Sequence, residues 1–209
     1  MLSEKLQAGL AEINLPFEKS QIDQLKIYLE LLKKWNKTYN LTAITDLQKM
    51  VPYHILDSLV IMDQIPQTAL CLDVGTGAGL PGIPLAIMMP QSNWVLLDSN
   101  GKKTRFVQQA IASCGLTNVK VVHSRIQDYH AESSFDVIVS RAYASVLDFV
   151  SSVDLLWQTD TRLITMKTEL SEGELQSLDS GMYTLKINQL NVPGIVENRS
   201  LITIQRQKI

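Results

Sequence analysis

The sequence predicts an α/β protein: a helical N-terminal part followed by a doubly wound, mostly parallel sheet with an antiparallel C-terminal hairpin. Apolar residues first recur at helical spacing, and short apolar runs then alternate with amphipathic segments. Two strand-like runs joined through Pro193 and Gly194 close the chain. A chain of 209 residues suits one domain with an appendage. We therefore expect a helical subdomain over residues 1–66 and a sheet core over 67–209, together forming one compact unit.

The helical part is expected to contain three helices. Leucine and isoleucine recur every three or four residues from Leu2 to Ile13, and Pro16 ends this segment. A second apolar face runs from Ser20 to Trp35, and a third helix is expected from His54 to Met62. The polar stretch Asn36–Thr45 between them is typical of turns.

The rest of the chain alternates between predicted strands and helices. The strands are expected at 69–74, 93–98, 119–123, 135–140, 162–167, 182–190 and 201–207. The helices are expected at 81–89, 102–114 and 146–156, with a short one at 172–178. This order predicts parallel strands with crossover helices, ending in a hairpin.

The most informative stretch joins the first predicted strand to the helix after it. The apolar run 69–74 leads into Gly75, Gly77, Gly79 and Gly82, and a helical pattern then begins at Pro81. A loop without Cβ atoms lets a ligand approach backbone N–H groups, with the positive end of the helix beneath it. The sequence thus predicts a ligand site at this loop.

The glycine spacing fits two classes of enzyme. Gly77, Gly79 and Gly82 match G-x-G-x-x-G, the dinucleotide pattern of nicotinamide-dependent oxidoreductases. Gly75, Gly77 and Gly79 match G-x-G-x-G, the pattern of methyltransferases that use S-adenosylmethionine. The next strand ends on Asp98, about twenty residues later, where a carboxylate can accept hydrogen bonds from ribose hydroxyls. Both alternatives share an adenosine, and the glycines alone leave the choice open.

Ligands of parallel sheets bind at the carboxyl ends of the strands, which selects two further segments. Residues 124–128 follow the third strand and include Arg125, and residues 140–143 follow the fourth and include Arg141. An arginine at such a position either contacts ligand or substrate, or forms a surface salt bridge.

Composition excludes several classes of protein. The net charge of −2 does not favour wholesale nucleic-acid binding, so an RNA partner would require basic residues gathered on one face. No apolar run is long enough for a membrane span, and the N-terminus lacks a secretory pattern. The two cysteines do not form a disulfide framework, and the three histidines do not form a metal-ligand set. We expect a cytoplasmic protein without metal.

Three basic clusters are nevertheless present, and each is also typical of a solvated helix face or strand end. They are Lys33, Lys34 and Lys37; Lys102, Lys103 and Arg105; and Arg199, Arg206 and Lys208.

If the cofactor is S-adenosylmethionine, the sequence narrows the acceptor. Enzymes that methylate exocyclic amines usually carry Asn- or Asp-Pro-Pro-aromatic after the fourth strand, where residues 140–143 read Ser-Arg-Ala-Tyr. Methylation of a pyrimidine carbon needs a nucleophilic cysteine, and neither Cys71 nor Cys114 lies at the carboxyl end of a strand. A ring nitrogen such as guanine N7 has a free lone pair and needs neither that segment nor a cysteine. Orientation of the lone pair and exclusion of water can supply most of the rate enhancement.

The chain closely resembles the glucose-inhibited division protein B family, the bacterial methyltransferases of small-subunit ribosomal RNA that act on guanine N7. The resemblance covers nearly the whole chain, and the Leu-Pro-Gly-Ile-Pro segment at 80–84 is its most specific part. The segments that carry it are Lys34–Thr42, His54–Ser58, Leu72–Ile87, Leu96–Ser99, Ser140–Ala142 and Met166–Lys167.

The resemblance implies a class I S-adenosylmethionine-dependent methyltransferase fold, Rossmann-like and monomeric, with S-adenosylhomocysteine as product. It implies that the donor contacts the glycine loop, that Asp98 holds the ribose and that Ile126 and Gln127 flank the adenine. Arg141 would lie near the methionine end. The loop candidates are Gly75, Gly77, Gly79 and Leu80.

The resemblance also implies roles for cations and a partner, small-subunit ribosomal RNA or the 30S particle. Arg141 and Arg125 are the candidate catalytic residues. The candidate RNA contacts are Lys102, Arg125, Lys167 and Arg199. The alternatives are an NAD-dependent oxidoreductase and a non-catalytic RNA-binding factor of ribosome assembly.

Four residues qualify the match to the family. The family often has an acid where this chain has Gln127, and often an arginine where it has Tyr53. His54 and Asp57 match a family motif, and on a helix each is a candidate for catalysis, capping or packing.

Overall fold

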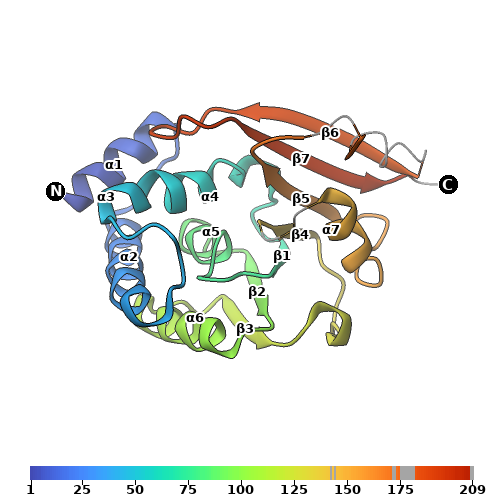
Figure 1. Cartoon of the computed structure of the whole chain (residues 1–209), viewed down its shortest axis with the longest axis horizontal. Coiled ribbons are helices and arrows are strands. Elements are labelled where there is room, and N and C mark those ends of the chain that lie inside the picture. The colour runs from blue at the N-terminus through green and yellow to red at the C-terminus, as the bar shows by residue number, and fades with distance from the viewer. Residues whose placement is uncertain (142, 144, 171–172, 175–181, 208–209) are drawn as a thin grey trace.

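The computed structural model describes residues 1–141, 143, 145–170, 173–174 and 182–207, and the short helix expected at 172–178 lies largely outside them. One seven-stranded sheet forms the centre of the molecule, in the order β3-β2-β1-β4-β5-β7-β6 (Figure 1). Its first five strands pair in parallel, β7 pairs antiparallel with β5, and β6 forms the edge as the antiparallel partner of β7. The predicted fold class is confirmed.

The strands match the expected positions closely, because apolar runs fit the buried inner strands and the alternating pattern of 183–190 fits the edge strand β6. Their bounds are β1 Leu70–Val74, β2 Asn93–Asp98, β3 Val119–His123, β4 Val137–Ser140, β5 Arg162–Lys167, β6 Tyr183–Leu190 and β7 Arg199–Arg206.

The helices include one run that differs from the expectation. The helix predicted from His54 begins at Leu47, because the Asp46 side chain caps it by accepting a hydrogen bond from the Gln48 N–H. The run then continues as a π-helix and a short α-helix. The bounds are α1 Leu2–Glu12, α2 Lys19–Tyr39, α3 Leu47–Met50, π-helix η1 Val51–Leu56, α4 Asp57–Leu59, α5 Gly82–Met88, α6 Gly101–Cys114 and α7 Val146–Ser152, with 3₁₀ turns η2 Met62–Gln64 and η3 Ile126–Asp128.

The two faces of the sheet are covered unequally (Figure 1). Helices α2, α4, α5 and α6 gather on one face, and the buried leucines of α1 and α2 belong to the same apolar cluster as α5 and α6. The other face has a smaller cluster, centred on Leu72, Ile138 and Phe149, with α7 packed over it. The β3–β4 connection contributes only the turn η3, so the sheet beside β3 has thin cover on that face.

Candidate active site

The glycine loop leaves β1 in a backbone conformation that favours glycine. Gly75, Gly77 and Gly79 have φ angles of 69°, 59° and 84°, in the left-handed region. The N–H groups of Gly75 and Thr76 both donate to the Leu97 carbonyl, at 2.8 and 3.0 Å. The loop is therefore tied to the end of the neighbouring strand through its own backbone.

Asp98 at the end of β2 holds the same loop through its side chain. Its Oδ2 accepts from the Gly77 N–H at 2.9 Å, and its Oδ1 accepts from the Asn100 N–H at 2.8 Å. The Lys103 ammonium lies 3.9 Å from Oδ2. A carboxylate oxygen has two lone pairs, so Asp98 retains capacity to accept from a ligand hydroxyl.

A cavity of about 440 Å³ opens beside Asp98 and brings five of the predicted site residues together. These are Gly75, Asp98, Arg125, Ile126 and Gln127. The same wall includes Tyr143 and Ser99, and it does not include the other predicted donor contacts. Those are Gly77, Gly79 and Leu80, which lie further along the loop, and Arg141, which follows β4.

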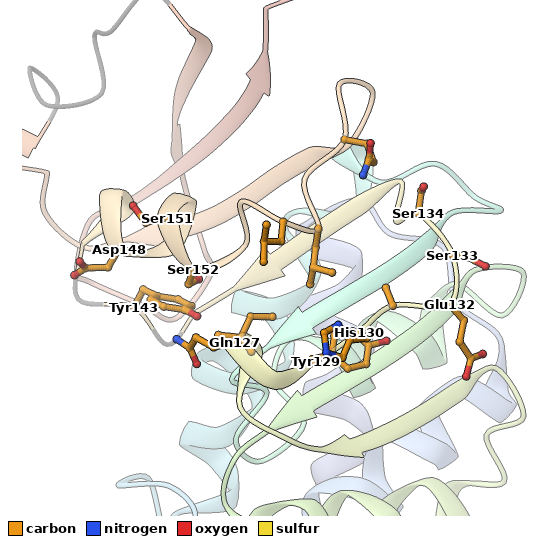
Figure 2. A pocket seen from close by; sticks show the side chains of 15 residues that line it. Gln127, Tyr129, His130, Glu132, Ser133, Ser134, Tyr143, Asp148, Ser151 and Ser152 are labelled. Atoms are coloured by element: carbon orange, nitrogen blue, oxygen red, sulfur yellow. The ribbon is translucent and has the colours of Figure 1, made fainter.

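A larger cavity of about 850 Å³ adjoins this one beneath the thinly covered part of the sheet. Figure 2 shows His130 of the β3–β4 connection on one side and Asp148 on the other, with Gln127 and Tyr143 next to each other between them. Of the described residues, its wall includes the acids Glu132 and Asp148 and no lysine or arginine. The smaller cavity is the better candidate for a nucleoside, because it combines the glycine loop with a carboxylate at ribose-binding spacing.

Asp73 is a buried acid within β1 that the sequence predictions did not single out. Its Oδ2 accepts from the Thr76 hydroxyl at 2.6 Å and from the Gly82 N–H at 2.9 Å, while Oδ1 is buried without a hydrogen-bond partner among the described residues. Burial raises the pKa of Asp73 to about 6. A Cβ at Gly82 would overlap Leu96 and lie 2.8 Å from the Asp73 carboxylate, so this position requires glycine. In the sequence, the position of this acid inside an apolar run was the signal that could have singled out Asp73.

Asp57 joins two of the predicted site cations, Arg141 after β4 and Arg199 at the start of β7. Its Oδ1 accepts from Arg199 Nε at 2.9 Å, and its Oδ2 lies 3.2 Å from Arg141 Nη1. Arg141 Nη1 also donates to the Ser58 hydroxyl at 3.1 Å. The Asp57 side chain is only 5% exposed, whereas those of Arg141 and Arg199 are 25% and 16% exposed. We call Asp57, Arg141 and Arg199 the arginine clamp.

His54 lies next to this clamp, within the π-helix. Its Nε2 is 2.9 Å from the Thr42 hydroxyl, and its backbone carbonyl accepts from the Ser58 hydroxyl. Burial lowers the pKa of His54 to about 4, which makes the imidazole neutral at pH 7. His54 Nδ1 is buried without a partner among the described residues. These contacts are those of a packed residue that supports the clamp.

The remaining predicted cations occupy different environments. Lys102 and Arg125 are exposed, at the start of α6 and after β3. Lys167 is mostly buried at the end of β5, where its ammonium lies 2.9 Å from Glu174.

Within the described residues, no group of three or more histidine, cysteine and acidic side chains is arranged to hold a metal ion. Across the same residues, no helix combines the length and apolar character that crossing a bilayer requires.

Relatives in sequence match this chain along its whole length. A protein named ribosomal RNA small subunit methyltransferase G from Shewanella sp. (strain W3-18-1) is 44% identical, over 99% of this chain and 100% of its own length. A protein of the same name from Shewanella baltica (strain OS155 / ATCC BAA-1091) is 42% identical over the same shares.

Solved structures at lower identity share the fold. A precorrin-6y C5,15-methyltransferase from Geobacter metallireducens GS-15 aligns with a TM-score of 0.55 at 14% identity, covering 81% of this chain and 92% of that one. M. capricolum TrmK, solved in complex with S-adenosyl-homocysteine, aligns with a TM-score of 0.59 at 14% identity, covering 73% and 68%. The fold is that of class I methyltransferases.

The family model of GidB, described as rRNA small subunit methyltransferase G, matches residues 21–203. That span contains the glycine loop, Asp98 and every residue of the arginine clamp. This chain belongs to the GidB family.

Proposed function

We propose that this protein transfers the methyl group of S-adenosylmethionine to N7 of a guanine in small-subunit ribosomal RNA, leaving S-adenosylhomocysteine. The observation that carries the proposal is the family match across residues 21–203, which includes a loop tied to Asp98 through Gly77. The alternative function, that of a nicotinamide-dependent oxidoreductase, is supported only by the glycine spacing, and the family match disfavours it.

The residues around the smaller cavity fit an adenosine-containing donor. Asp98 has acceptor capacity for ribose hydroxyls, and Ile126 and Gln127 offer an apolar contact and backbone groups for the adenine. Gly75 leaves the loop free of a side chain where the donor would pass. When bound, the donor supplies an electrophilic methyl group on a sulfonium sulfur. We assign further donor contacts to Gly77, Gly79, Leu80 and Arg141.

The chain's own contribution to the reaction is orientation. Guanine N7 carries a lone pair and no proton, so the transfer needs no general base. Arg141 and Arg125 are the proposed catalytic residues, since guanidinium groups can hold guanine O6 and neighbouring phosphates. Fixing the base against the donor supplies much of the rate. Asp57 supports this role because it holds one edge of Arg141.

The proposed partner of the enzyme, a monomer in the cytoplasm, is small-subunit ribosomal RNA or the 30S particle. The names of the relatives support the RNA partner. Lys102, Arg125, Lys167 and Arg199 are the proposed RNA contacts. For Lys167 and Arg199, a phosphate would have to compete with Glu174 and Asp57 respectively.

Transfer of labelled methyl to small subunits from cells that lack this protein tests the proposal. We expect incorporation at one guanine, mapped as N7-methylguanine, and binding of S-adenosylhomocysteine but not NADH in calorimetry. RNA binding without turnover on naked RNA or particles would instead identify a non-catalytic assembly factor.

A further inference from the structure

The C-terminal end of α2 carries a basic and aromatic surface that the proposed function leaves unused. Lys33 and Lys37 are one helical turn apart and exposed, and Tyr39 beyond them is 41% exposed. Among the described residues, the ion pairs of α2 involve Lys26 and Glu30 and not these two lysines. Two uncompensated charges and an exposed ring therefore share one end of the helix. We call this the α2 surface.

A cavity of about 550 Å³ adjoins the two lysines. The Asn36 amide holds its wall in place: Nδ2 donates to the Thr42 carbonyl at 2.9 Å, and Oδ1 accepts from the Thr42 N–H at 2.8 Å. The Thr42 hydroxyl in turn contacts His54 at 2.9 Å. Asn36 is buried, so this segment is fixed to the helix. The cavity is lined by Lys33, Asn36, Lys37, Asn40, Thr42, Ala43 and Thr45.

The contacts between α2 and α6 locate this surface relative to the donor site. The Gln24 amide donates to the Cys114 carbonyl at 2.8 Å, so the first part of α2 lies beside the end of α6. Further along, the rings of Trp35 and Phe106 are 5.7 Å apart. The two helices therefore run antiparallel, and the end of α2 lies beside the first turn of α6, which carries Lys102 (Figure 1).

The first turn of α6 is also part of the candidate active-site edge. It begins just after Asp98, and its Lys103 lies 3.9 Å from that carboxylate. The Tyr28 hydroxyl on α2 donates to the Ala78 carbonyl of the glycine loop at 2.8 Å. The α2 surface consequently lies at the same edge of the sheet as the loop and Asp98.

We propose that the α2 surface docks a single-stranded segment of the substrate RNA that flanks the target guanine. Lys33 and Lys37 bind backbone phosphates, and Tyr39 stacks against a base. Asn40 and Thr45 at the cavity offer polar groups to ribose hydroxyls. This assignment rests on the proposed function, since it names how that function's substrate is held.

The test removes the same number of charges from two places. The variant Lys33→Ala/Lys37→Ala is compared with Lys5→Ala/Lys19→Ala, in which both lysines are exposed. Lys19 begins α2, so it lies about 20 Å from Lys33 at 1.5 Å of rise per residue. Methyl transfer is measured on 30S subunits from cells that lack this protein, across a range of subunit and salt concentrations.

We expect Lys33→Ala/Lys37→Ala to raise KM for the subunit about tenfold or more and to leave kcat within about twofold. The slope of log affinity against log salt should fall by about 1.5, the value for two lost phosphate contacts. Tyr39→Ala should raise KM about five- to tenfold without changing that slope, because stacking releases no counterions. Affinity for S-adenosylhomocysteine should stay unchanged in all variants.

The proposal is overturned if the wild type transfers methyl and Lys33→Ala/Lys37→Ala matches Lys5→Ala/Lys19→Ala in KM and salt slope. The proposed function survives that result. Absence of transfer by the wild type would instead remove the proposed function. In that case, the affinity of each double variant for the same subunits is measured directly. Equal affinities of Lys33→Ala/Lys37→Ala and Lys5→Ala/Lys19→Ala would overturn the proposal for the α2 surface.

Discussion

The two sides of the candidate active site are constructed differently. On the donor side, the glycine loop and Asp98 are close in sequence and are connected largely through backbone N–H and carbonyl groups. On the other side, Asp57 of α4, Arg141 just after β4 and Arg199 of β7 are far apart in sequence and meet only through side chains. Substitutions on the first side should therefore affect donor binding and folding together, whereas those in the arginine clamp should lower transfer more than donor binding, to which Arg141 contributes only one of the proposed contacts.

Removal of Arg141 should give the largest effect and tests the separation most directly. We expect Arg141→Ala to lower kcat for methyl transfer about 10²- to 10³-fold, the scale of losing one preorganised donor at a reacting group. Affinity for S-adenosylhomocysteine should fall far less. Arg206→Ala, which removes the half-buried partner of Asp154, is the control and should retain activity. A loss of melting temperature that accounts for the lost activity would make Arg141 structural.

The buried acid of the donor side predicts a pH dependence of stability. Because burial raises the pKa of Asp73 to about 6, above the unfolded value, the stability that this group contributes is present below about pH 4 and is lost as the pH rises through 6. Asp73→Asn keeps an acceptor oxygen and cannot ionise. We expect it to gain up to about 3 kcal/mol relative to the wild type between pH 4 and 7. Urea unfolding at four pH values measures the difference, and a pH-independent difference would contradict it.

Asp98→Ala should weaken binding of S-adenosylhomocysteine by about 1–3 kcal/mol, the cost of lost hydrogen bonds. It should also loosen the loop, because Gly77 loses its acceptor. Calorimetry and thermal unfolding measured together test both effects. Asp128→Ala, an exposed acid in the β3–β4 connection, is the matched control. Unchanged donor affinity in Asp98→Ala would mean that the ribose is held elsewhere.

Asp57→Asn should give a smaller effect, confined to the arginine clamp. The variant keeps one acceptor oxygen but loses the charge that holds two guanidinium groups, so we expect kcat to fall about tenfold through misplacement of Arg141. Both arginines are partly hydrated, and the loss of stability should stay near 1 kcal/mol. Affinity for S-adenosylhomocysteine should fall less than kcat, since only one of the proposed donor contacts is displaced. If that affinity falls as much as kcat, the two sides are not separable. Asp154→Asn controls for loss of an exposed ion pair.

Most of the fold could be predicted from the sequence because its signals are local. Apolar or alternating runs predicted all seven strands of the sheet, and the amphipathic pattern of 102–114 predicted α6 within one residue. The third N-terminal helix was predicted from His54 and begins at Leu47. Its start depends on the side-chain cap of Asp46, and its π-helical segment has no periodic signal.

The donor side of the candidate site could also be predicted from the glycine spacing and the acid after the next strand. The glycines supply the positive φ angles that the loop adopts, and the acid accepts a hydrogen bond from the loop backbone. The spacing alone did not distinguish a methyltransferase from an oxidoreductase, and Asp73 went unnoticed within its apolar run. The roles of the predicted site residues stay predictions until the substitutions are made.

By itself, the sequence determined the fold class, the glycine loop and the carboxylate that ends β2. Each of these can be read from residue patterns within short segments of the chain. Only the tertiary structure decided that Asp57 meets two arginines, that Lys167 is paired with Glu174, and that the end of α2 lies beside the start of α6. These depend on how the helices pack on the sheet. Side chains far apart in sequence become partners only through that packing.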